Sequence, residues 1–293
     1  MTADSTSDRC LRFLFEEADI RGESVHLTRA YRDIVSLHQY PPGVSLMLGQ
    51  FLAAATLLST TLKFEGKLVL QARSDAQIPL LMVECDHQLH VRAIARGAQE
   101  ATSRRFDQLL AGGQLAITID PIRGQRYQGI VPLSGDSLAH SLDAYFWLSE
   151  QLATRLWLAA DGERAAGLLL QQLPRQVAAD PEAQQDAWDH ACVLAATVTR
   201  QELLNQPAES LLHRLYHEEP VRLFPAAAVT FRCDCSRERT FNALSALDPG
   251  EIEELLQELG SITMDCEFCN QQYRFEREDL AGVLGGDQAK ILH

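Results

Sequence analysis

Two cysteine motifs, Cys233-Asp-Cys235 and Cys266-Glu-Phe-Cys269, decide the fold of the C-terminal part of this chain. The residues between them, 236–265, are enough for a small folded segment that brings the four sulfurs together. Four thiolates at the corners of a tetrahedron are the ligand set of a structural zinc ion. Each pair can also close on itself as a disulfide, and a sulfur in a disulfide no longer binds zinc. The motifs therefore predict one Zn²⁺ per chain in the reduced state and allow an oxidised state without it.

A segment as short as residues 229–293 needs such a staple, because it buries too little apolar surface for a comfortably stable core. A structural zinc site contributes about 10–16 kcal/mol of apparent binding free energy at neutral pH. We expect the metal to act as a folding clamp, so that its loss melts the module. Spacing alone leaves two alternatives open, a permanent clamp and a clamp that oxidation releases. The strained ring of a Cys-x-Cys disulfide and the four oxidisable thiolates favour release.

Composition and charge limit the partners that this chain can have. Apolar residues make up 46% of the chain and charged residues 23%, as in globular proteins, and the net charge is −14. Residues 231–293 carry 13 acidic and 6 basic side chains, so a nucleic-acid backbone should be repelled. The sequence has no phosphate-binding loop and no nucleophile elbow, which argues against nucleotide use and hydrolysis.

The N-terminus and the cysteine content predict a compartment. Residues 1–8 have neither the basic start nor the apolar run of a secretory signal. We therefore expect a cytoplasmic protein, whose seven cysteines are thiols or metal ligands in a reducing environment.

Residues 44–62 contain no charged side chain over 19 positions, a length that suggests a membrane-spanning helix. A strand-like segment follows directly, and the run is interrupted by polar residues and a glycine. We therefore predict a buried helix of a folded domain and no membrane partner. The interrupting residues are Ser45, Gly49, Gln50, Thr56, Ser59, Thr60 and Thr61.

Strand and helix signals alternate over residues 1–178 and predict an α+β fold class, with a mixed-sheet N-terminal domain around the long buried helix. Gly22 is expected to break the first strand signals into a hairpin, and Pro41-Pro42-Gly43 to precede the long helix. Candidate strands cover residues 10–15, 25–28, 67–73, 79–85, 90–95, 115–120, 126–133, 155–160 and 167–173, and further helices cover 103–111 and 138–150.

The pattern changes after Asp180, where Pro181 opens a helical region. We predict a helical connector over residues 179–228 that lies on an apolar surface, followed by a small C-terminal zinc-binding α+β module over 229–293. In that module we expect strands at 229–233 and 272–276, and mostly helix over 245–259 with Asp248-Pro249 as its start signal. The apolar face of the connector carries Trp188, Ala191, Cys192, Ala195, Val198 and Leu203.

The remaining cysteines and one histidine pair have ordinary explanations. Cys10 and Cys85 lie in apolar strand patterns and Cys192 lies on the apolar face of a helix, so all three are predicted to be core residues. His213 and His217 are four residues apart, but no His-Glu-x-x-His pattern supports a metal site, and a solvated helix face is expected.

The order of several further stretches, ending with the two cysteine motifs, resembles the 33 kDa chaperonin family, the redox-regulated heat-shock holdases of bacteria. The cysteine spacing is the most specific of these signals. At Ala165-Ala166-Gly167 the chain departs from the family, which more often has two glycines there. The other stretches are LVLQ (68–71), GGQLAITID (112–120), RYQGIVPL (126–133), YFWLSEQ (145–151), TRLWL (154–158) and GLLLQQLP (167–174).

This resemblance implies a mechanism. In the reduced, inactive protein Cys233, Cys235, Cys266 and Cys269 would hold zinc. Peroxide-type or hypochlorous oxidants, with unfolding stress, would form Cys233–Cys235 and Cys266–Cys269 disulfides and release the metal. The module, residues 229–293, would then act as a redox switch, and the connector, residues 179–228, as a metastable linker that unfolds.

The resemblance also implies what the protein would act on. The apolar surface exposed in this way would bind unfolding client proteins without ATP. Residues 1–178 would form the N-terminal chaperone domain. The oxidised protein would be a homodimer. On this interpretation the protein is not an enzyme.

Two other functions remain as alternatives. Cys266-Glu-Phe-Cys269 matches the pattern of a thiol–disulfide oxidoreductase, although such a motif usually opens a helix near the N-terminus of a thioredoxin-like fold. The four cysteines also fit a zinc-ribbon binding module with a permanent structural zinc, against which the acidic charge argues if the ligand is a nucleic acid.

Overall fold

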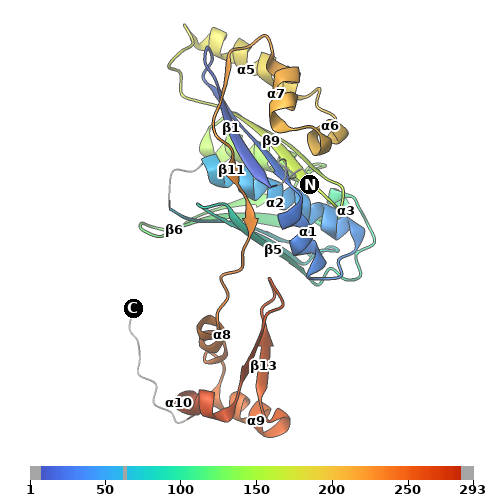
Figure 1. Cartoon of the computed structure of the whole chain (residues 1–293), viewed down its shortest axis with the longest axis vertical. Coiled ribbons are helices and arrows are strands. Elements are labelled where there is room, and N and C mark those ends of the chain that lie inside the picture. Colours follow the sequence, from blue (N-terminus) through green and yellow to red (C-terminus); the bar gives the residue numbers. More distant parts are fainter. Residues whose placement is uncertain (1–7, 62–64, 285–293) are drawn as a thin grey trace, which may run out of the picture. The chain divides into compact units, whose positions relative to one another are not determined.

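The structure is a computed structural model that describes residues 8–61 and 65–284. The chain divides into two compact units, residues 1–232 and residues 233–293, and each is treated by itself below (Figure 1). The α+β fold class is confirmed in both units, because each combines sheets with helices.

The first unit contains two sheets, which we call sheet A and sheet B. Sheet A has the strand order β10-β1-β2-β9-β8, with β11 also paired to β1, and sheet B has the order β12-β5-β4-β3-β6-β7. The strands of sheet A are β1 (Arg9–Phe15), β2 (Ile20–Leu27), β8 (Thr154–Ala160), β9 (Ala165–Gln172), β10 (Val221–Leu223) and β11 (Ala227–Ala228). Those of sheet B are β3 (Gly66–Arg73), β4 (Leu80–Asp86), β5 (His90–Arg96), β6 (Gln114–Pro121), β7 (Tyr127–Pro132) and β12 (Thr230–Phe231).

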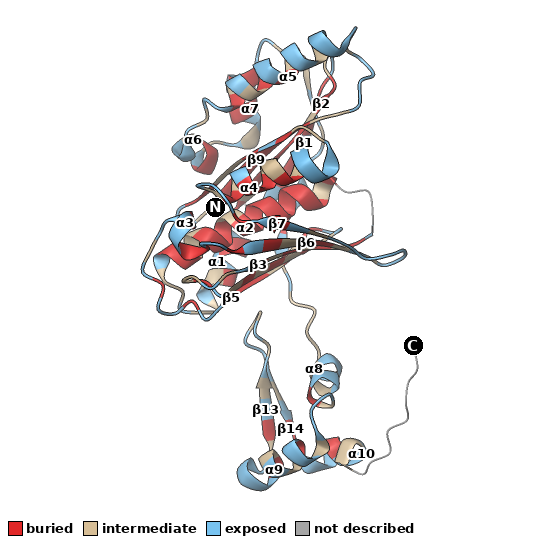
Figure 2. Ribbon diagram, turned by 180° about the vertical axis from the view of Figure 1, so that it is seen from behind, coloured by how far each residue is buried: buried red, intermediate tan, exposed pale blue. Residues whose placement is uncertain are grey.

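The long apolar helix α2 (Pro42–Thr61) is buried between the two sheets, as Figure 2 shows. It contacts β2, β8 and β9 of sheet A and β3, β4 and β5 of sheet B, which explains why it is apolar on every side. By length and composition alone α2 could cross a membrane, but 78% of its most apolar window is buried inside the protein. The predicted buried helix is therefore confirmed; its expected last residue, Leu62, lies outside the described residues.

Three shorter helices complete this part of the unit. Helix α1 (Arg29–Ser36) precedes α2, and α3 (Phe106–Leu109) lies between β5 and β6. The predicted helix over 138–150 is α4 (Leu138–Tyr145), which continues as a π-helical turn, η1 (Phe146–Glu150). This turn ends at Gln151, whose φ of 53° is left-handed and stops the helix.

The role predicted for Gly22 was wrong. The turn between β1 and β2 covers residues 16–19, and Gly22 lies inside β2, paired with Phe13 of β1. A Cβ atom at position 22 would lie 2.0 Å from the ring of Phe13, so the glycine leaves room for that ring. A glycine that admits a neighbouring side chain gives the same sequence signal as one that allows a turn.

The connector forms three helices, α5 (Pro181–Ala195), α6 (Arg200–Asn205) and α7 (Ala208–Tyr216), which belong to the first unit. The Asp180 carboxylate accepts a hydrogen bond from Ala183 N (2.9 Å) and caps α5. The predicted apolar surface beneath the connector is the face of sheet A that points away from α2. Its buried side chains are Leu11, Phe13, Phe15, Ile20, Ala159, Ala166, Leu168 and Leu170.

The strand predicted at 229–233 is shorter and lies in the first unit. Thr230 and Phe231 form β12, which pairs in parallel with His90 and Val91 of β5 in sheet B. Residues 221–231 therefore leave the edge of sheet A, where β10 and β11 pair with β1, and reach the edge of sheet B.

The second unit is small. It contains α8 (Arg237–Leu244), α9 (Pro249–Leu259), the hairpin β13 (Ile262–Asp265) and β14 (Gln272–Phe275), the 3-10 turn η2 (Arg277–Leu280) and α10 (Ala281–Leu284). The predicted strand at 272–276 is confirmed as β14. Within the mostly helical stretch predicted over 245–259, α9 begins at the predicted start signal, because proline is favoured in the first helical turn and the Asp248 carboxylate accepts from Gly250 N (2.8 Å). Helix α8, which Ser236 caps, was not predicted.

Candidate metal centre

The hairpin of the second unit positions one cysteine pair. Cys266 directly follows β13, and its amide continues the ladder by donating to Gln271 O (2.9 Å). The chain then turns back, with Cys269 N and Asn270 N both donating to Cys266 O (3.2 and 2.7 Å). Asn270 has a φ of 56°, a left-handed conformation that asparagine tolerates better than most residues. The tight turn places the thiols of Cys266 and Cys269 on the same side.

The other pair lies between β12 and α8. Alternate residues of an extended chain point to the same side, which suits the Cys233-Asp-Cys235 spacing. Arg239, in the first turn of α8, donates from Nη1 to Asp234 O (3.0 Å), and the same nitrogen lies 2.7 Å from the Asp234 carboxylate. Because Ser236 caps α8 by accepting from Arg239 N (3.2 Å), the helix start and the cysteine motif are fixed together.

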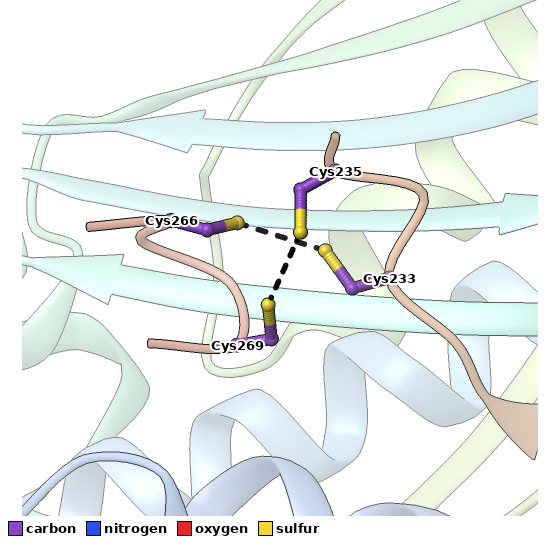
Figure 3. Close-up of side chains that lie close together, drawn as sticks. All are labelled: Cys233, Cys235, Cys266 and Cys269. Carbon is purple, nitrogen blue, oxygen red and sulfur yellow. Dashed lines mark hydrogen bonds between the residues drawn. The ribbon is translucent and has the colours of Figure 1, made fainter. Parts of the chain in front are cut away.

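All four predicted sulfurs meet in one cluster (Figure 3). Cys233 Sγ lies 3.6 Å from Cys266 Sγ, and Cys235 Sγ lies 3.4 Å from Cys269 Sγ. Every pair of the four atoms is within 4.8 Å. A tetrahedral ion with metal–sulfur bonds of about 2.3 Å needs sulfur–sulfur separations of about 3.8 Å. The four cysteines are therefore positioned to hold a metal ion, and among residues 8–61 and 65–284 no other histidine, cysteine or acidic group is arranged this way.

The electrostatics of the cluster favour a cation. Tyr273 donates its hydroxyl to Cys235 Sγ (3.2 Å). Burial raises the pKa of Cys235, but the hydrogen bonds from Tyr273 and the other cysteines outweigh it, so that this pKa is lowered. Burial and the neighbouring sulfurs raise the pKa of Cys269, and the hydrogen bond to Cys235 raises the pKa of Tyr273 to about 12. Further thiolates next to the first one need a positive charge among them.

Neither Tyr273 nor Arg239 was predicted. The contact of Tyr273 depends on the β13–β14 register, in which Tyr273 pairs with Met264, and spacing along the chain does not reveal that register. For Arg239 a signal was present, since Ser236 followed by three helix-compatible residues is typical of a capped helix start.

The remaining predicted positions behave as ordinary residues. Cys10 and Cys85 are buried and Cys192 is half-buried against the connector core. Burial raises the pKa of all three thiols, to about 12 for Cys85 and Cys192, which keeps them protonated and unreactive. His213 and His217 stack on each other with ring centroids 6.0 Å apart.

The cysteine pair of the oxidoreductase alternative does not open a helix. Cys266 and Cys269 lie in the turn of the β13–β14 hairpin, so no helix N-terminus activates either thiol. The geometry gives that alternative no support.

Comparisons with known proteins agree with this site. A sequence profile of the Hsp33 protein family matches residues 8–276. The 33 kDa chaperonins of Pseudomonas paraeruginosa and Azotobacter vinelandii are each 52% identical to this chain, with 96% of both chains covered. The crystal structure of the 33 kDa chaperonin from Thermotoga maritima superposes with a TM-score of 0.82 at 22% identity, covering 95% of this chain and 98% of that one, which shows the same fold.

The family match covers the described part of the first unit and all four cysteines of the second. The chain belongs to the Hsp33 protein family.

Proposed function

We propose that this protein is a redox-regulated, ATP-independent holdase chaperone. Cys233, Cys235, Cys266 and Cys269 would hold one zinc ion in the reduced, inactive protein. Oxidation would pair Cys233 with Cys235 and Cys266 with Cys269, and the connector would then leave sheet A. We expect this cycle in the cytoplasm, where thiols are kept reduced until oxidative stress.

The observation that carries this proposal is that the closest sulfur contacts join one cysteine motif to the other. The closest sulfurs, at 3.4 and 3.6 Å, belong to different motifs, so a metal bound there ties residues 233–235 to residues 266–269. Disulfides within each motif would tie each segment only to itself. Oxidation thus removes the cross-link that closes a loop of about 30 residues, and with it the stabilisation of the module.

The oxidation step balances with two equivalents of a peroxide. The four sulfurs lose four electrons and form two S–S bonds. Two peroxide molecules accept these electrons with four protons from solvent and become four waters. The half-buried cysteines are open to a small oxidant.

The connector supplies the apolar surface. Helices α5 to α7 cover much of one face of sheet A, where Phe13, Phe15 and Leu168 are among the fully or nearly fully buried residues. Arg232, the residue before Cys233, still donates to Val91 O (3.1 Å), so the described hydrogen bonds of the first unit continue up to the cysteine motif. When the module melts, we expect the connector to lose its end restraint. The uncovered face would bind unfolding clients through apolar contact, and the oxidised chains would form homodimers.

The test combines zinc release, thiol counting and client aggregation. Peroxide should release one zinc per chain, remove four free thiols and suppress the aggregation of a thermally unfolding client. Disulfide mapping should find links within each motif. Zinc release without any gain in aggregation suppression would mean that the zinc has only a structural role. Disulfides between the two motifs would contradict the proposal, because they would keep the motifs cross-linked.

A further inference from the structure

A cavity of about 240 Å³ lies where the α6–α7 turn of the connector crosses β1 and β2. This volume is below the range of about 300–1,000 Å³ for pockets that take drug-sized ligands. His26 of β2, which lines the cavity, ties helix α6 to the sheet, because its Nε2 is hydrogen-bonded to Leu203 O (2.9 Å). The cavity is therefore a defined space between the sheet and the connector, with walls from both.

A buried hydroxyl without a partner lines this cavity. Ser24 pairs with Leu11 in the β1–β2 ladder and lies on the connector side of sheet A. It is 1% exposed, and its Oγ has no hydrogen-bond partner among the described residues. A buried hydroxyl in this state costs free energy, which a ligand with a hydrogen-bond acceptor would recover.

Three arginines also line the cavity, against one acidic residue, Glu209. Arg9, on β1, has no ion-pair partner within the ranges 8–61 and 65–284. Arg164 reaches Asn205 of the connector and lies only at 3.7 Å from the Asp161 carboxylate. Arg32 is more fully occupied, with Nε 2.8 Å from Glu163. Arg9 and Arg164 thus have donors left for an anion.

The start of α7 completes the cavity wall. Ala208 and Glu209 of its first turn line the space. The residue before them is Pro207, which has no side-chain acceptor, so this nine-residue helix has no side-chain cap. Uncapped amides and the positive end of the helix dipole attract negative charge. The helix start, the arginines and the buried Ser24 hydroxyl converge on one place.

We propose that this cavity is an oxyanion site that binds a phosphate-class ligand, with Arg9 and Arg164 pairing with its charge. The Ser24 hydroxyl and the first amides of α7 donate to its oxygens. The lining carries three guanidinium groups against one carboxylate, that of Glu209, so its charge favours an anion over a cation.

A ligand there touches both the sheet and the connector. It would therefore bind the docked connector and not the released one, and would stabilise docking by mass action. This consequence rests on the proposed function, because it matters only if connector release activates the protein. Binding itself does not depend on that proposal.

Calorimetry with inorganic phosphate on the reduced, zinc-loaded full chain tests the site, with chloride at matched ionic strength as the blank. We expect saturable binding of one phosphate per chain. Arg9→Gln and Arg164→Gln should each weaken it about tenfold, the size of one charge-assisted hydrogen bond. Ser24→Ala should weaken it without changing the charge, and Glu209→Gln should tighten it. Hydrogen exchange should show slower amides in α7 when phosphate is present.

The matched control is Arg123→Gln, an exposed arginine in the β6–β7 turn of sheet B, which should leave binding unchanged. Absence of saturable binding in the millimolar range would overturn the proposal. Equal weakening by Arg123→Gln would do the same, because it would mean general charge attraction. If the protein binds phosphate but never suppresses aggregation after oxidation, the anion site is supported and the proposed function is contradicted.

Discussion

The two units of this protein are stable for different reasons. The first surrounds one long helix with two sheets and packs three more helices on the outside, so nearly every strand has a buried face. The described part of the second has one small core of six buried side chains: Leu244, Ile252, Leu256, Ile262, Phe275 and Leu280. The first unit has a large buried core, whereas we expect the second, with its small core, to need a metal bound by the four cysteines. This difference is what the proposed redox switch requires, since loss of the metal would then affect the second unit and spare the first.

A similar contrast exists within the first unit, between the two faces of sheet A. Helix α2 covers one face and has no charged residue, so exposing it to water would be unfavourable. The connector covers the other face with helices whose outer sides are polar. It is also attached by polar contacts, such as the hydrogen bond between His26 Nε2 of β2 and Leu203 O of α6 (2.9 Å). The proposed function therefore assigns release to the connector, whose outer side is polar, while the uncharged helix α2 stays buried.

The largest expected effect separates the two units. Cys266→Ser should remove the zinc site and unfold the module, because about 10–16 kcal/mol of apparent binding free energy is lost. The first unit should keep its structure. Zinc content and hydrogen exchange resolved by segment measure this. Cys192→Ser, at a half-buried cysteine outside the cluster, is the control and should leave both unchanged. Equal loss of protection in α2 would show that the units are not independent.

A second prediction concerns the buried carboxylate of Glu23 in the first unit, whose oxygens, like Ser24 Oγ, have no hydrogen-bond partner among the described residues. Burial raises its pKa to about 8, against the opposing effect of Arg12 and Arg21. The folded state then holds a proton that the unfolded state releases near its ordinary pKa of about 4.3. Stability should therefore fall as the pH rises from about 4.3 to 8, by a few kcal/mol in total.

Glu23→Gln should abolish this dependence and make the first unit more stable at pH 8, as urea unfolding at several pH values can measure. Glu100→Gln, at an exposed position, is the control and should keep the wild-type slope. An unchanged slope in Glu23→Gln would show that the carboxylate is hydrated in solution.

A smaller effect tests the close approach of Phe13 to β2. Gly22→Ala places a methyl group where the Phe13 ring lies, and overpacking of this kind costs about 1–3 kcal/mol. Because Phe13 belongs to the core beneath the connector, we expect the connector to loosen and oxidative activation to become faster. Gly162→Ala, at a position with open space but a φ of 96°, should lose stability by backbone strain without affecting activation.

The smallest effect compares two helix caps. Asp180→Ala removes the cap of α5, and Ser137→Ala removes the equivalent cap of α4, where Ser137 accepts from His140 N (3.2 Å). Each should cost about 1 kcal/mol. Only the connector variant should activate faster with peroxide, measured by the lag before aggregation suppression. If both variants or neither shortened the lag, the connector would not be the part that responds.

The features that could be predicted from sequence are those set by local pattern. The spacing of Cys233, Cys235, Cys266 and Cys269 predicted their cluster because a metal ligand set depends on residue type and loop length. The apolar run of α2 predicted burial for the same kind of reason. The parallel pairing of β12 with β5 and the contact of Tyr273 with Cys235 could not be predicted, since each depends on a partner far along the chain.

Residues 221–231 pair with the outer side of β1 and then with the outer side of β5. This one segment therefore covers the edge strand β1 of sheet A and the edge strand β5 of sheet B. Detachment of residues 221–231 would expose unpaired backbone N–H and C=O groups along both β1 and β5. Such exposed edges pair with strands of other polypeptides. With this segment detached, the protein would therefore bind an unfolding client in two ways, through backbone hydrogen bonds and through apolar contact.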